Sequence, residues 1–228
     1  MTRAEQITAN LAEVRARIAA AARAAGRAPE SVKLLAVSKK MSADDVRAGI
    51  AAGQRAFGEN YAQELRDKSA LLAAEPAPPE WHFIGPLQAN KVKYVAGKVA
   101  LLHSVGSPAL LDAVEARGKA QSCLVQVNVA GEASKSGVAP ADLPALLDRF
   151  APCKHARCEG LMLIPPRGDP RPHFAELRAL RDREAAIARP NVDLRELSMG
   201  MTEDLEIAVE EGATIVRVGT AIFGPRPT

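Results

Sequence analysis

The chain alternates short apolar runs with longer stretches of helical periodicity, and it does so eight times in succession. Val, Ile and Leu dominate the short runs, which is typical of strands buried in a parallel sheet. Parallel strands need a crossover connection, and each longer stretch supplies a helix for one. The predicted strands occupy residues 32–39, 56–59, 81–85, 100–105, 123–129, 159–165, 196–201 and 214–219.

A helix is predicted after each strand, and one further helix precedes them all. In this leading helix the apolar residues at positions 7, 11, 14 and 18 share one face, and Gly26 is placed to end it. Thr202 is the expected N-cap of the helix that follows the seventh strand. The crossover helices are expected over 43–53, 61–74, from about 90, 107–119, 140–150, 171–188 and 202–212, with a short helical turn over 220–224.

Eight such units predict an α/β fold, a single (β/α)8 barrel of the TIM type with an extra N-terminal helix. A chain of 228 residues is near the small end of the range for this fold. An open doubly wound sheet is the alternative, but no G-x-G-x-x-G follows the first strand. The proline-rich 75–80 is too short to separate domains, so we expect residues 1–228 to form one domain.

Charge and cysteine content exclude several classes of protein. A net charge of +3 without a basic block argues against nucleic-acid binding. No stretch is apolar enough for a membrane span, and the N-terminus lacks the apolar core of a signal peptide. Three cysteines, an odd and low number, indicate a reduced, cytoplasmic setting. The "CKHARC" at 153–158 fits no usual zinc spacing, so we expect no metal there.

Polar side chains lie in or just after the predicted strands, and the carboxyl ends of strands carry the active sites of this fold. Lys39 ends the first strand and Asn60 follows the second. His82 lies within the third strand, Ser198 within the seventh and Arg217 within the eighth. Because the strands of a barrel end around one opening, these residues are expected to converge on one pocket.

The last two strand ends have the composition of a phosphate site, which barrels often build there. Gly219 allows a close approach of the backbone, while Ser198 and Thr220 offer hydroxyl groups. A phosphate site near Lys39 indicates a phosphorylated carbonyl compound held as a Schiff base. Pyridoxal 5′-phosphate is the leading candidate, because it uses a lysine imine and a phosphate anchor together.

Each candidate residue also has a purely structural interpretation. Lys39 is also explained as a solvated strand end, and His82 as a hydrogen-bonded core histidine. Arg217 is also explained as a buried partner of a carboxylate such as Glu59, and the glycines as an aid to packing. No single residue decides between the two interpretations, but their agreement on one face of one barrel favours a binding site.

Several longer segments resemble the YggS/PROSC family of pyridoxal phosphate homeostasis proteins, from about residue 5 to 225. They read "AVSK", "FGENYAQE", "WHFIGPLQANK", "QVNVAGEASKSGV", "GLMLIP" and "LSMGMTEDLEIAVEEGATIVRVGTAIFG". The resemblance implies a barrel similar to the N-terminal domain of alanine racemase, with pyridoxal 5′-phosphate bound as a Schiff base to Lys39. The chain departs from the family after this lysine, where it reads "SKKMSADD" instead of continuing with a threonine and a proline.

The resemblance also implies roles for the other candidates. Arg217 is expected near the pyridine nitrogen, and the phosphate is expected against the residues that end the seventh and eighth strands. Two further residues fall in family motifs and are expected to line the pocket. The implied cofactor-binding residues are Lys39, Asn60, His82, Ser198, Arg217, Gly219 and Thr220.

Two functions follow from such a site, a carrier of the cofactor and an amino-acid racemase. A racemase needs an acid or base on each face of the substrate α-carbon. In alanine racemase a second domain supplies the opposite tyrosine, whereas Tyr61 and Tyr94 are expected at helix starts or on the surface here. We therefore expect a monomeric homeostasis protein that buffers pyridoxal 5′-phosphate with little or no catalysis and has no catalytic residue. Delivery to pyridoxal-phosphate-dependent apo-enzymes stays open, and an aldolase-type use of Lys39 on a sugar phosphate is the remaining alternative.

Overall fold

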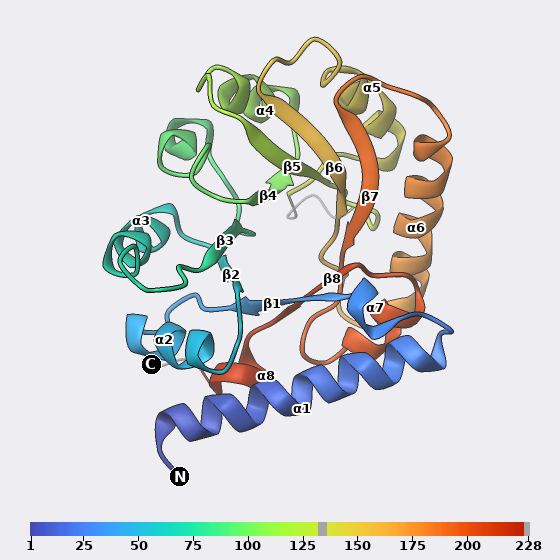
Figure 1. Cartoon of the computed structure of the whole chain (residues 1–228). Coiled ribbons are helices and arrows are strands. Elements are labelled where there is room, and N and C mark those ends of the chain that lie inside the picture. The colour runs from blue at the N-terminus through green and yellow to red at the C-terminus, as the bar shows by residue number, and fades with distance from the viewer. Residues whose placement is uncertain (132–135, 226–228) are drawn as a thin grey trace.

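The computed structural model describes residues 1–131 and 136–225, and their strands form a closed parallel barrel (Figure 1). Each strand pairs with the next one in chain order, and β8 closes the ring by pairing with β1. The predicted (β/α)8 barrel is therefore confirmed. The strands are β1 (Lys33–Val37), β2 (Ala56–Glu59), β3 (Glu80–Phe83), β4 (Leu101–Val105), β5 (Gln121–Gln126), β6 (Ala156–Met162), β7 (Val192–Ser198) and β8 (Ile215–Val218).

Helices surround the barrel in the order that the sequence predicts. The α-helices are α1 (Arg3–Ala24), α2 (Ala43–Ala51), α3 (Ala62–Leu71), α4 (Pro108–Glu115), α5 (Leu143–Asp148), α6 (Arg171–Ala185), α7 (Leu205–Glu210) and α8 (Thr220–Phe223). Short 3₁₀ segments add η1 (Pro29–Ser31), η2 (Ala89–Tyr94) and η3 (Pro140–Asp142).

Two of the predicted helices differ from the structure. The helix expected from about residue 90 is the short 3₁₀ segment η2, which ends at Tyr94, three residues before Gly97 with its φ of +74°. The helix expected from Thr202 begins at Leu205 instead, with Asp204 in the N-cap position. The Asp204 carboxylate accepts a hydrogen bond from the main-chain N–H of Met201, which holds residues 201–204 in a turn before the helix.

The leading helix α1 lies across the outside of the barrel and packs against α2, α7 and α8 (Figure 1). Its N-terminus is held by a capping box between Thr2 and Glu5. The apolar face predicted at positions 7, 11, 14 and 18 is buried, as expected for an amphipathic helix on a barrel surface.

The inside of the barrel is only partly apolar. A small cluster of buried aliphatic side chains fills much of it, including Leu35, Leu124 and Met162. Buried polar side chains lie on β3, β4, β7 and β8, at positions 82, 103, 198 and 217. Among the described residues, no helix has the length and apolar character of a membrane span, and no cluster of three or more potential metal ligands occurs.

Candidate functional site

A cavity of about 320 Å³ opens at the carboxyl end of the barrel. Its lining comes from the ends of β1, β2, β3, β6 and β8 and from the loops that follow β7 and β8, so distant parts of the sequence meet there. The lining residues are Val37, Lys39, Asn60, Ile84, Ile164, Met201, Thr202, Glu203, Asp204, Arg217, Gly219 and Thr220.

Five of the seven residues predicted to bind a cofactor line this cavity. They are Lys39, Asn60, Arg217, Gly219 and Thr220. The other two predicted residues, His82 and Ser198, are fully buried in the barrel interior and are not part of this lining. The structure therefore places the hydroxyl of Ser198 beneath the pocket, bonded to Arg217, and the contacts predicted for His82 and Ser198 with a cofactor stay predictions.

Strand alternation explains which of the two lysines enters the cavity. Successive side chains of a strand point to opposite faces, and Leu35 and Val37 belong to the cluster inside the barrel. Lys39 continues that alternation and is half-buried in the cavity lining. Lys40 is exposed, has a φ of +63°, and donates its main-chain N–H to Glu64.

A buried ionic cluster supports the turn that carries Lys39. Lys68 of α3 donates hydrogen bonds to Glu59 at 2.9 Å, to Glu64 at 2.7 Å and to the carbonyl oxygen of Ser38 at 2.6 Å. Ser38 also donates its hydroxyl to Glu59 at 2.7 Å. Burial raises the pKa of Glu59, and the nearby ammonium group opposes this effect.

The structural interpretation of Arg217 as a partner of Glu59 is wrong. Glu59 pairs with Lys68 and not with Arg217, because it lies on the helix-facing side of β2. Lys68 was not predicted to be buried, since a lysine in an amphipathic helix is usually solvated. The only signal in the sequence is the Glu64–Lys68 spacing of four residues, which is common on exposed helices too.

Asn60 brings an unsatisfied acceptor to the cavity. Its side-chain oxygen Oδ1 is buried and has no hydrogen-bond partner among the described residues. Buried polar atoms in folded proteins are nearly always bonded, so an orphaned acceptor that lines a cavity indicates that a ligand donates to it. Gly85 packs directly against this residue, because a β-carbon at Gly85 would lie 2.1 Å from the Asn60 carbonyl oxygen.

Arg217 brings a positive charge to the floor of the cavity. Its Nη1 donates to the Ser198 hydroxyl and its Nη2 to the carbonyl oxygen of Leu163, both at 2.8 Å. Burial lowers its pKa to about 10, so the guanidinium is still charged at neutral pH. Thr202, expected only as a helix cap, adds a hydroxyl to the lining, because α7 starts three residues later than predicted.

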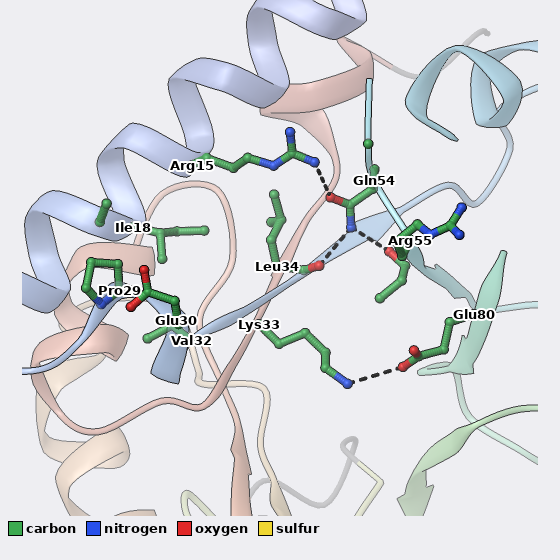
Figure 2. Close-up of a pocket in the computed structure, with 13 residues that line it drawn as sticks. Arg15, Ile18, Pro29, Glu30, Val32, Lys33, Leu34, Gln54, Arg55 and Glu80 are labelled. Atoms are coloured by element: carbon green, nitrogen blue, oxygen red, sulfur yellow. Dashed lines mark hydrogen bonds and ion pairs between the residues drawn. The ribbon is translucent and has the colours of Figure 1, made fainter. Parts of the chain in front are cut away.

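A second hollow, of about 450 Å³, lies at the opposite end of the barrel beside α1 (Figure 2). Lys33 and Glu80 face each other across it at 3.2 Å, and Arg15 donates to the Gln54 side chain. None of the predicted binding residues lines this hollow. Because functional sites of this fold lie at the carboxyl ends of the strands, the cavity around Lys39 is the candidate site.

Comparison with known proteins shows the family of this chain. A family model described as alanine racemase, N-terminal domain, matches residues 9–227. The pyridoxal phosphate homeostasis protein of Pseudomonas aeruginosa is 48% identical, and the alignment covers 96% of each chain. The protein of the same name from Escherichia coli K12 is 40% identical, with 96% of this chain and 97% of the relative covered.

Solved structures show the same fold. PipY of Synechococcus elongatus, solved with PLP bound, superimposes with a TM-score of 0.82 at 36% identity and covers 96% of this chain and 100% of its own. Alanine racemase of Corynebacterium glutamicum superimposes with a TM-score of 0.65 at 18% identity, over 98% of this chain and 62% of the racemase. The likeness to alanine racemase concerns the fold alone. The likeness to PipY extends over nearly the whole of both chains, which are also related in sequence. This chain belongs to the family of pyridoxal phosphate homeostasis proteins.

Proposed function

We propose that this protein binds pyridoxal 5′-phosphate in the cavity at the carboxyl end of the barrel, holds it as a Schiff base on Lys39, and serves pyridoxal phosphate homeostasis with little or no catalysis. The observation that carries the proposal is the placement of Lys39 in one lining with Arg217, Gly219 and Thr220. A relative 36% identical over the same length was solved with this ligand bound.

The residues of the cavity fit the chemical groups of this ligand. A volume of about 320 Å³ is in the range of small-molecule sites. Thr202 and Thr220 supply hydroxyl donors for a phosphate, and Gly219 lets the main chain come close. The orphaned Oδ1 of Asn60 supplies an acceptor for a hydroxyl group of the ligand. When bound, pyridoxal phosphate supplies an aldehyde that reacts reversibly with amines.

Arg217 favours storage of the cofactor over catalysis with it. A guanidinium group only donates hydrogen bonds and stays protonated, so the pyridine nitrogen beside it is kept unprotonated. An unprotonated ring is a weaker electron sink, which disfavours proton abstraction from a bound amino acid. The role of Arg217 is therefore to bind and orient the ring.

The racemase alternative lacks a tyrosine in the lining of the cavity. Tyr61 stands at the N-cap of α3, is half exposed and does not line the cavity. Tyr94 ends η2 and is also absent from the lining. We propose that the chain is a single-domain, monomeric, cytoplasmic protein whose open cavity allows exchange of the ligand with other amines, including those of pyridoxal-phosphate-dependent apo-enzymes.

Reductive trapping tests the proposal directly. The purified protein is mixed with pyridoxal 5′-phosphate, reduced with borohydride and digested, and the modified peptide is identified by mass spectrometry. We expect one visible absorption band and label on Lys39, lost in Lys39→Ala and kept in the matched control Lys40→Ala. Label scattered over surface lysines, with Lys39 unmodified, would overturn the proposal. Incubation of the loaded protein with L- or D-alanine then distinguishes the two functions. A carrier leaves the enantiomer unchanged, whereas a racemase converts it.

A further inference from the structure

Five polar side chains form a continuous hydrogen-bonded chain through the inside of the barrel. Arg217 Nη1 lies 2.8 Å from Ser198 Oγ, and Ser198 Oγ lies 2.9 Å from His103 Nδ1. His103 Nε2 lies 2.9 Å from His82 Nδ1, and His82 Nε2 lies 2.9 Å from Glu80 Oε1. This chain starts in the candidate binding cavity and ends at the opposite rim of the barrel.

The two ends of the chain fix the direction of its hydrogen bonds. Arg217 can only donate, so Ser198 Oγ accepts from it. Glu80 is partly exposed and forms an ion pair with Lys33 at 3.2 Å, so it is ionised, and an ionised carboxylate can only accept. His82 therefore donates through Nε2.

The middle of the chain has one fully satisfied arrangement. Burial lowers the pKa of His103 well below the usual value of a histidine, so the ring is neutral and carries a single N–H. If that proton were on Nδ1, Ser198 Oγ would accept hydrogen bonds from both Arg217 and His103. The hydroxyl proton of Ser198 would then have no acceptor among the described residues. With the proton on Nε2, Ser198 donates to His103, and His103 donates to His82.

We propose that Glu80, His82 and His103 are positioning residues for Arg217: both imidazoles carry their proton on Nε2, and the chain holds Ser198 with a lone pair aimed at the guanidinium group. Hydrogen bonds aligned in one direction polarise one another, which strengthens Ser198 as an acceptor. The guanidinium is thereby fixed on one side by Ser198 and on the other by the Leu163 carbonyl.

The far end of the chain lies in the hollow of Figure 2. There Glu80 is shared between His82 and Lys33, and the side chain of Glu80 is 43% exposed. A charge change at this rim therefore alters the cofactor cavity through the barrel interior, without any contact between the two sites. The effect on the cofactor rests on the proposed function, whereas the proton positions do not.

The proton positions are tested on the cofactor-free protein by ¹⁵N NMR of the histidine rings, assigned with His82→Gln and His103→Gln. We expect the rings of His82 and His103 each to be protonated on Nε2 and not on Nδ1. An Nδ1-protonated or doubly protonated His103 would overturn the proposal. This result does not depend on whether the protein binds pyridoxal 5′-phosphate.

The positioning role is tested by paired variants loaded with pyridoxal 5′-phosphate. His103→Gln keeps an acceptor for Ser198 and a donor for His82, whereas His103→Phe keeps the volume and removes both. We expect the dissociation constant to rise about tenfold in His103→Phe, with a shift of the visible band, and to change by less than about threefold in His103→Gln. Equal effects of both variants would reduce His103 to a packing role and refute the proposal.

A substitution at the far rim of the barrel tests the same proposal if His103→Phe does not fold. Glu80→Gln removes the charge at the far end, and Glu30→Gln removes the other carboxylate of the same hollow as a control. We expect a shifted visible band in Glu80→Gln and a wild-type band in Glu30→Gln. Identical spectra would show that Glu80 does not act on Arg217. Failure of the wild-type protein to bind the ligand would refute the proposed function, and the NMR result would still decide the proton positions.

Discussion

The ammonium group of Lys68 donates a hydrogen bond to the main-chain carbonyl oxygen of Ser38, at 2.6 Å, immediately before Lys39 in the sequence. The same nitrogen lies 2.9 Å from Glu59, whose side chain is completely buried. Helix α3 thus holds the end of β1 from outside the barrel. The orientation of the proposed Schiff-base lysine therefore depends on an ion pair whose two residues do not line the cavity.

Replacing Lys68 by methionine is expected to lower the free energy of unfolding by about 3 kcal/mol, because Glu59 would keep a buried charge without its cation. Urea unfolding measures this change. Lys98→Met, on the surface, is the matched control and should change stability by less than about 0.5 kcal/mol. The double variant Lys68→Met/Glu59→Leu should recover part of the loss, and equal losses in the two single lysine variants would contradict the ion-pair argument.

Gly85→Ala is expected to disrupt the cavity, because the new β-carbon would lie 2.1 Å from the carbonyl oxygen of Asn60. Main-chain atoms cannot move aside cheaply, so Asn60 must shift with its side chain. We expect at least a tenfold loss of affinity for pyridoxal 5′-phosphate, measured by absorbance titration. Gly26→Ala is the control: it adds left-handed strain of about 1 kcal/mol at an open site, since φ is +68°, and should leave affinity unchanged. Wild-type affinity in Gly85→Ala would show that the backbone of Asn60 is free to adjust.

The order of strands and helices could be predicted because hydrophobic periodicity is a local property. Lys39 and Asn60 stand at the ends of predicted strands, and the structure has both in the cavity at the mouth of the barrel. The sequence pattern does not give the depth of a side chain along the barrel axis, which depends on the tilt and stagger of all strands together. Ser198 ends β7 but does not line the cavity, whereas Arg217 lies within β8 and does.

Long-range pairs were harder to predict than the fold. Lys68 is buried only because Glu59, on another element, compensates its charge, and no local pattern encodes that pair. The series of hydrogen bonds from Arg217 to Glu80 likewise joins residues of four strands. Its members were visible in the sequence only as single polar residues in apolar runs.

The three cysteines are expected to differ sharply in reactivity. Burial raises the pKa of Cys123 well above its usual value and that of Cys158 to about 12, whereas Cys153 is only half-buried, although burial raises its pKa too. Because the thiolate is the reactive form, iodoacetamide should label Cys153 first in the native protein. Peptide mass spectrometry measures the order, with labelling in denaturant as the control in which all three react. Early labelling of Cys123 or Cys158 would mean that the barrel opens under native conditions.

His103 is expected to make the protein less stable as the pH falls below about 6.5. Its pKa is lowered in the folded state, mainly by burial and further by His82, Arg217 and Lys33, so below pH 6.5 the unfolded chain binds a proton that the folded chain does not. The free energy of unfolding therefore decreases as protons are added, by about 1 kcal/mol for this one group between pH 6.5 and 5.5. Glu80 does not contribute to this change in stability, because its pKa of about 2 in the folded protein and its ordinary pKa in the unfolded chain both lie below pH 5.5.

Denaturant unfolding of the wild type and of His103→Gln at the two pH values measures this contribution. The difference in stability between the two proteins should change by about 1 kcal/mol in favour of the variant as the pH falls from 6.5 to 5.5. Leu102→Val, in the same strand, is the control: it removes packing but no titratable group, so its deficit should be the same at both pH values. A difference between wild type and His103→Gln that does not vary with pH would mean that His103 takes up its proton in the folded barrel, and His103 would then donate to Ser198 through Nδ1 instead of accepting from it.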